Sequence, residues 1–130
     1  MTETAIVDLS FTRPPLNLNQ RLHWAQKAEL TRDIRQEVCI KARPLKAAFA
    51  PGPIIVSLHW QPKDNRRRDS DNPVLTAKAC FDGIVDAGLV PDDTPEHMVK
   101  LMPIIHPAIK GEPAKCWLEI QAGTIQQAAT

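Results

Sequence analysis

Alternating hydrophobic and polar residues predict four β-strands. Residues 5–11 alternate with a period of two, as in a strand with one buried face. Residues 54–60 alternate too, but both faces are largely apolar, so we expect this strand in the centre of the sheet. Stretches 99–105 and 115–121 predict two more strands, and the turn sequence Gly111-Glu112-Pro113 between them favours an antiparallel pair.

Residues 20–41 change to a helical spacing. Apolar residues recur every four positions and predict the buried stripe of a helix, at Leu30, Ile34, Val38 and Ala42. Asn17 or Asn19 can cap this helix. Pro44 ends it at or before Arg43, and residues 47–53 then form a connecting loop.

A second helix is predicted from Pro73 to Ala87. Asn72 is a suitable cap, with proline in the first helical position. Gly83 weakens the helix interior and so indicates close approach by another element. Gly88 is placed to end the helix.

These elements predict one small α/β domain with a mixed sheet and two main helices, in the order β-α-β-α-β-β. A length of 130 residues fits a single core. We expect the domain to cover residues 1–121, and residues 122–130, which are small and polar, to form a flexible tail.

Charge is distributed unevenly although the net charge is only +1. Residues 21–46 hold seven cations and three anions, or +4, whereas residues 69–96 hold seven anions and one cation, or −6. The near-neutral total excludes a protein that is basic overall, so a nucleic-acid surface would be local. A basic helix beside an acidic pocket is one way to bind an anion and a metal together.

Cysteine and histidine show no metal-binding pattern. The three cysteines have no CxxC spacing, which argues against a zinc site or a disulfide framework and favours reduced thiols in the cytoplasm. No signal segment or membrane-spanning apolar run is present in the sequence. Among the histidines, we expect His59 within a strand and His97 and His106 at the surface.

Asp69 and Asp71 are the first candidates for chemistry. In an extended segment, carboxylates two residues apart project to the same side and can face one cation. Their hard oxygen ligands suit Mg²⁺ or Mn²⁺. The alternative is a loop in which Asp71 or Asn72 caps the following helix. A calcium loop starting at Asp69 is excluded, because Cys80 stands where the bidentate glutamate belongs.

Asp92 and Asp93 form a second pair, for which a capping box from Asp93 to Glu96 is the alternative. Lys78 projects from the side of its helix near Asp71 and could contact a phosphate. Its alternative is an i, i+4 ion pair with Asp82. Arg66, Arg67 and Arg68 suit phosphate oxygens, although such runs are often simply solvated.

Together these residues resemble the RusA family of Holliday junction resolvases, which phages and prophages often carry. The resemblance covers roughly residues 9–120 and rests on Arg66–Asn72, Lys78, Phe81-Asp82, Asp86–Gly88 and Asp92-Asp93. It implies a small α/β homodimer that nicks four-way DNA junctions with Mg²⁺ or Mn²⁺, in the cytoplasm of a bacterial host cell. Six residues separate Asp71 from Lys78, more than is usual in the family.

The resemblance also implies roles for individual residues. Asp69, Asp71 and Asp93 correspond to metal-binding catalytic carboxylates, and Lys78 to an essential lysine. The residues expected to contact DNA are Arg66, Arg67, Arg68, Arg21, Lys27 and Arg32. Two alternatives remain: a module that binds junctions without cutting them, and a nuclease for flaps or forks.

Overall fold

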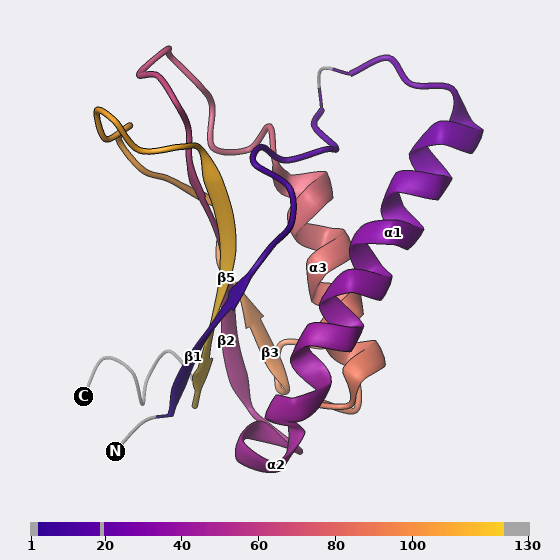
Figure 1. The fold of residues 1–130 in the computed structure, drawn as a ribbon. Helices are drawn as coiled ribbons and strands as arrows, with labels where there is room; N and C mark the ends of the chain where they lie inside the picture. Colours follow the sequence, from indigo (N-terminus) through magenta and orange to yellow (C-terminus); the bar gives the residue numbers. More distant parts are fainter. Residues whose placement is uncertain (1–2, 19, 124–130) are drawn as a thin grey trace.

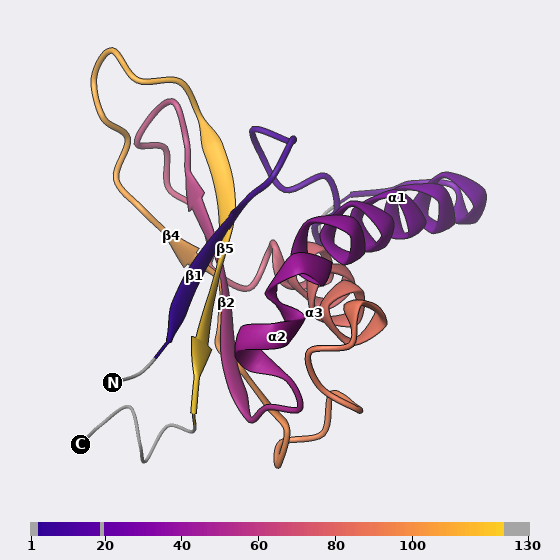
Figure 2. The same ribbon diagram turned by 60° about the horizontal axis from the view of Figure 1, so that its bottom comes forward.

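The computed structural model describes residues 3–18 and 20–123, and shows one five-stranded sheet with helices against one face (Figure 1). The elements in chain order are β1 (Thr4–Asp8), α1 (Trp24–Ala42), the 3₁₀ turn η1 (Arg43–Leu45), α2 (Lys46–Phe49), β2 (Ile54–Gln61), α3 (Val74–Ala87), β3 (Met98–Lys100), β4 (Ile104–Ile105) and β5 (Lys115–Ala122). The predicted α/β class, mixed sheet and two main helices are confirmed. Figure 2 shows α1 and α3 on the same side of the sheet.

β2 is the central strand, as its two apolar faces predicted. It pairs with β5 in antiparallel orientation over its whole length, from Ile54 opposite Ala122 to Gln61 opposite Lys115. Its other edge carries β3 and then β4, both parallel to β2. β1 pairs with the outer edge of β5. The carboxyl end of β2 therefore leads from the middle of the sheet into the loop that carries the predicted site.

The predicted antiparallel pair between residues 99–105 and 115–121 is wrong. The first stretch forms two short strands, β3 and β4, and both pair with β2 instead of β5. Pro103 lies between them and has no N–H for a ladder hydrogen bond, which accounts for the break. β5 uses the opposite edge of β2, where all eight residues find a partner.

α1 begins at Trp24, four residues later than predicted, because His23 caps it. His23 Nδ1 accepts a hydrogen bond from the backbone N–H of Ala25 at 3.2 Å, a function that the sequence assigned to Asn17 or Asn19. Of these, Asn19 lies outside the described residues. The helix ends at Ala42, as Pro44 predicted, and the predicted loop 47–53 instead begins within α2.

α3 packs closely against α1 at Gly83. A Cβ atom placed there would lie 2.7 Å from the carbonyl oxygen of Arg35 and 2.8 Å from Cβ of Val38, so the predicted close approach is confirmed. Gly88 ends the helix with a φ of 88°, a left-handed conformation suited to glycine. Asn72 is not the cap: Pro73 occupies that position and makes no side-chain capping bond.

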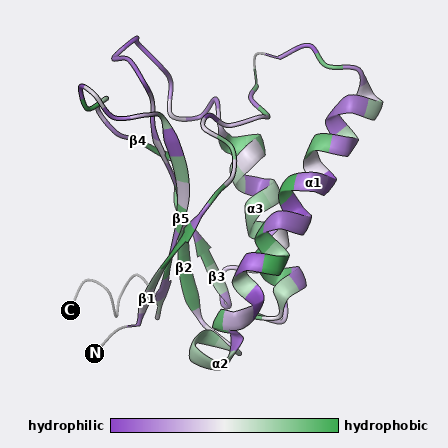
Figure 3. Ribbon diagram, in the orientation of Figure 1, coloured by the Kyte–Doolittle hydropathy of each residue, from purple (hydrophilic) through white to green (hydrophobic). Residues whose placement is uncertain are grey.

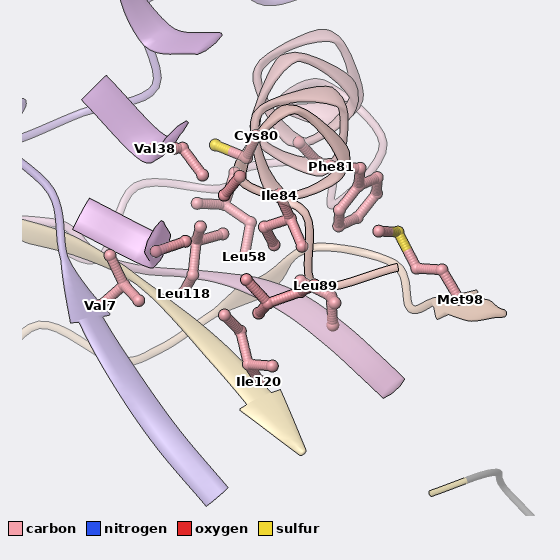
Figure 4. Close-up of a cluster of buried hydrophobic side chains, with 14 of the residues drawn as sticks. Val7, Val38, Leu58, Cys80, Phe81, Ile84, Leu89, Met98, Leu118 and Ile120 are labelled. Carbon is pink, nitrogen blue, oxygen red and sulfur yellow. The ribbon is translucent and has the colours of Figure 1, made fainter. Parts of the chain in front are cut away.

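The hydrophobic core lies between the sheet and the helices (Figure 4). Alternate residues of β2 and β5 meet the buried stripes of α3 and α1, including the predicted Ile34, Val38 and Ala42. Figure 3 shows that α1 is mostly hydrophilic along its length, whereas β2 is largely hydrophobic. No helix within the described residues is long and apolar enough to span a membrane.

Two histidines occupy the sheet face that α1 and α3 leave uncovered. His59 is buried in β2, and its Nδ1 lies 2.8 Å from Nε2 of His106. His106 is half-buried, so the prediction of a simple surface histidine is corrected. Both rings stack with Trp117 of β5. At the end of that strand, Ala122 is still paired, and residues 124–130 of the predicted tail lie outside the described residues.

Candidate active site

Arg68 holds the loop that follows β2. Its guanidinium carbon lies 4.9 Å from the ring centroid of Trp60, and Nη2 donates a hydrogen bond to Oδ1 of Asp64 at 2.7 Å. Nη1 donates to the backbone carbonyl oxygens of Asp64 and Arg66. The hydrogen bond from Arg68 also lowers the pKa of the Asp64 carboxyl. With only 19% of its side chain exposed, Arg68 uses its donors within the loop.

Arg66 and Arg67 lie on the surface of the same loop. The side chain of Arg66 is 82% exposed, and Arg67 is exposed as well. Both line a cleft of about 1080 Å³ between this loop and the N-terminal segment before α1, which we call the basic cleft. Its charged lining comprises Arg13, Lys63, Arg66, Arg67, Arg68, Asp64 and Asp69, or five cations and two anions. The cleft therefore favours an anionic ligand.

Asp69 and Asp71 lie in consecutive turns that lead into α3. Their backbone carbonyl oxygens accept hydrogen bonds from the N–H groups of Asn72 at 3.1 Å and Val74 at 3.2 Å. Both residues are exposed. The capping position of α3 is occupied by Pro73. The alternative prediction, in which Asp71 or Asn72 caps this helix, is therefore wrong.

Asp93 lies beyond the other end of α3, where the chain turns back toward β3. Oδ2 of Asp93 is 3.2 Å from Nζ of Lys100, and this hydrogen bond lowers the pKa of the Asp93 carboxyl. Asp92 supports the same loop, because its Oδ1 accepts the backbone N–H of Asp93 at 2.7 Å. Lys78 adds a further attraction that lowers the pKa of Asp93. Asp93 is therefore held mainly by Lys100, the last residue of β3, and by Asp92 within its own loop.

Lys78 is 68% exposed and contacts one acidic residue of its own helix. Its Nζ is 4.0 Å from Oδ2 of Asp82, so the predicted i, i+4 ion pair is present at the limit of contact. Such an exposed pair contributes only about 0.2–0.5 kcal/mol. Lys78 is therefore free enough to interact electrostatically with Asp93 as well.

The chemistry of the three predicted metal ligands fits a hard divalent cation, since all are carboxylates on exposed or half-buried loops. Within residues 3–18 and 20–123, however, no three His, Cys, Asp or Glu side chains are grouped closely enough to hold a metal ion. Asp93 is paired with Lys100, while Asp69 and Asp71 lie at the start of α3. Holding one ion with all three would require their side chains to move together.

Lys100 was missed in the sequence. In the register of β3 with β2, Met98 lies opposite Ile54 and Lys100 opposite Val56, both core residues. Lys100 therefore projects from the helix-covered face at the end of a short strand. Its position two residues after a buried methionine is the signal that could have identified it. No comparable pattern marks Arg13 or Lys63 as cleft residues.

The remaining predicted DNA contacts lie on another surface. Lys27 and Arg32 line a groove of about 990 Å³ along α1, together with Trp24, whose surface is 76% exposed. At this groove Arg35 makes two hydrogen bonds to Asp86, at 2.7 and 3.0 Å, which joins α1 to α3. Arg21 is exposed in the segment that precedes α1. The six predicted contacts are thus divided between the basic cleft and the region of α1.

Asp69 and Asp71 precede α3 and Asp93 follows it, and the cations of the candidate site come from the loop after β2, from α3 and from β3. A scan against models of protein families and a search of curated proteins found no match to this chain.

Proposed function

We propose that this chain is a divalent-metal-dependent endodeoxyribonuclease that hydrolyses phosphodiester bonds in branched DNA, with four-way junctions as its preferred substrate. One observation carries the proposal: Asp69, an exposed carboxylate, lines a cleft whose other charges are mainly cations. A carboxylate among arginines is unfavourable for plain phosphate binding, because it repels the phosphate. It becomes useful when a metal ion lies between the two.

Asp69, Asp71 and Asp93 are the residues that would hold Mg²⁺ or Mn²⁺. Such an ion, when bound, lowers the pKa of a coordinated water and stabilises negative charge on the phosphate. Lys100, which is paired with Asp93, and Lys78, whose charge also acts on Asp93, would neutralise charge on a phosphate oxygen or leaving group. Asp92 orients the loop by accepting the N–H of Asp93.

Binding of the DNA backbone would involve two groups of cations. Arg66 and Arg67 offer exposed guanidinium groups at the basic cleft, and Arg68 fixes the loop that carries them. Arg21, Lys27 and Arg32 extend positive charge along the start of α1. Because these contacts release counterions, affinity should decrease steeply as salt increases.

A homodimer is part of the proposal. A four-way junction has two-fold symmetry, and a C2 dimer would present two equivalent sites for paired nicks. The proposed setting is the cytoplasm of a bacterial host cell. Burial raises the pKa of the Cys80 thiol, and raises that of Cys116 to about 12, which keeps both as unreactive thiols.

The proposal is tested with a panel of end-labelled DNA substrates: a four-way junction, a flap, a fork and a linear duplex of matched sequence. We expect paired nicks in the junction with Mg²⁺ or Mn²⁺, and no cleavage in EDTA. Preference for flaps or forks would select the alternative nuclease. Junction binding without cleavage of any substrate, across a range of metal concentrations, would contradict nuclease activity and favour the non-cleaving module.

A further inference from the structure

The basic cleft contains flat aromatic and guanidinium surfaces as well as charge. Phe11 and Trp60 both line it and both are half-buried. The guanidinium of Arg68 covers the ring of Trp60 and is fixed there by its hydrogen bonds to the loop. A planar group entering the cleft could therefore stack on Phe11 or on the immobilised guanidinium.

The positive charges of the cleft come from two separate segments of the chain. Arg13 belongs to the N-terminal segment, whereas Lys63, Arg66 and Arg67 belong to the loop after β2. Of the two anions in the lining, Asp64 is neutralised by its bond to Arg68 at 2.7 Å. Cations from two separate segments suit a ligand whose charged backbone continues on either side of a flat group.

The combination distinguishes between forms of nucleic acid. Bases in a duplex are stacked on one another and cannot offer their faces to a side chain, whereas unpaired bases can. A volume of about 1080 Å³ accommodates a ligand of nucleotide size. Phe11 also packs against the hydrophobic core, so the part of its side chain that lines the cleft is what a ligand could use. Duplex binding alone would require the cations but not the aromatic and guanidinium surfaces of the lining.

We propose that the basic cleft binds an unpaired nucleotide of a single DNA strand, together with its flanking phosphates. This inference rests on the proposed function for its choice of DNA, and it adds a means of selecting substrate. Branch points supply unpaired or easily unstacked nucleotides, and linear duplex does not. Selection of branched DNA would then arise within one chain, next to Asp69, independently of dimer geometry.

The test is fluorescence anisotropy in EDTA, with a labelled oligothymidine and with a duplex of equal length. The wild type should bind the single strand more tightly. Arg13→Gln combined with Lys63→Gln should weaken single-strand binding and make its salt slope shallower by about 1.4, the value for two lost phosphate contacts. Phe11→Leu should weaken it by about fivefold or more without changing that slope. Lys46→Gln, on α2, is the matched control, and thermal unfolding verifies that every variant folds.

Two results would overturn the inference: equal affinity of the wild type for single strand and duplex, or unchanged single-strand affinity in the Arg13→Gln and Lys63→Gln variant. Arg13 and Lys63 are exposed, so their replacement tests the inference even if Phe11→Leu disturbs packing. The binding test requires no cleavage, so failure of this inference can be distinguished from failure of the proposed function. A chain that binds single strands but nicks nothing supports the inference alone, and one that nicks junctions without single-strand preference contradicts the inference alone.

Discussion

Lys100 and Asp93 form an ion pair at the position where one of the proposed metal ligands is needed. The 3.2 Å contact occupies Oδ2 of the carboxylate, and both side chains are only about one-third exposed. A divalent cation must compete with this ammonium group for the same oxygen. At the proposed site, Lys100 would therefore lower the affinity for metal while adding positive charge for a phosphate.

Replacing Lys100 by methionine removes the competing charge and keeps the length of the side chain. We expect the Lys100→Met variant to bind Mn²⁺ roughly two- to fivefold more tightly, the equivalent of a partly exposed ion pair of about 0.5–1 kcal/mol. Isothermal titration calorimetry without DNA measures this directly, with Lys110→Met as the control. Equal or weaker binding in Lys100→Met would show that the pair does not oppose the metal.

The α1–α3 contact at Gly83 is the feature of the helices that tolerates substitution least. Alanine gains about 1 kcal/mol in helix propensity, but its Cβ would meet a backbone carbonyl of Arg35 at 2.7 Å. A backbone atom cannot move aside as a flexible side chain can, and overpacking typically costs about 1–3 kcal/mol. Because the clash is with backbone, we place the cost in the upper part of this range, at about 2–3 kcal/mol. After the gain in propensity, we expect Gly83→Ala to lower the free energy of unfolding by about 1–2 kcal/mol.

Urea denaturation followed by circular dichroism measures that loss. Ala28→Gly, on the exposed side of α1, serves for comparison because it changes only helix propensity, by about 1 kcal/mol. A Gly83→Ala variant as stable as the wild type would mean that α1 and α3 can separate slightly at no cost.

Sequence patterns sufficed for the elements whose periodicity is strong. The four-residue spacing of Ile34, Val38 and Ala42 and the doubly apolar β2 both correspond to the observed burial. The partners of the last strands were not predictable in the same way. Local turn chemistry around Gly111 suggested a hairpin, but pairing depends on which edge of β2 is open, a property of the whole sheet.

Candidate site residues could be named from the sequence where they are adjacent in the chain, and not where the fold brings distant residues together. Asp69 and Asp71 stand out by spacing alone. Lys100 reaches Asp93 only because β3 runs parallel to β2, and Arg13 reaches the basic cleft only because the N-terminal segment lies against the loop after β2. The stacking of Arg68 on Trp60 likewise has no signal in a run of three arginines.

Across the whole molecule, the sheet face opposite the helices has its own polar centre around His59. Ser57 Oγ lies 2.9 Å from His59 Nε2, and Glu119 Oε2 lies 3.5 Å from the same atom. Burial lowers the pKa of His59, an effect that Glu119 partly opposes and His106 reinforces. The folded protein thus favours a neutral His59.

The stability of the protein should therefore depend on pH below about 6.5, the ordinary pKa of histidine. In that range an unfolded chain binds a proton at His59 that the folded chain does not, so stability is fully present above about pH 6.5 and decreases as the pH falls toward the lowered value. We expect the free energy of unfolding of the wild type to be smaller at pH 5.5 than at pH 7.5. The difference between the two pH values should be smaller in the His59→Gln variant. An identical pH dependence in wild type and variant would contradict this account.

The central claim is that Asp69, Asp71 and Asp93 support metal-dependent cleavage of branched DNA. Its most direct test is the rate of nicking of a synthetic four-way junction over a Mg²⁺ titration, in the wild type, Asp71→Asn and Asp33→Asn, which neutralises an exposed carboxylate on α1. We predict metal-dependent nicking by the wild type and Asp33→Asn, and a loss of about 100-fold or more in Asp71→Asn, because a bound ion contributes several kcal/mol. Equal nicking by Asp71→Asn, or none by the wild type at any Mg²⁺ concentration, would contradict the claim.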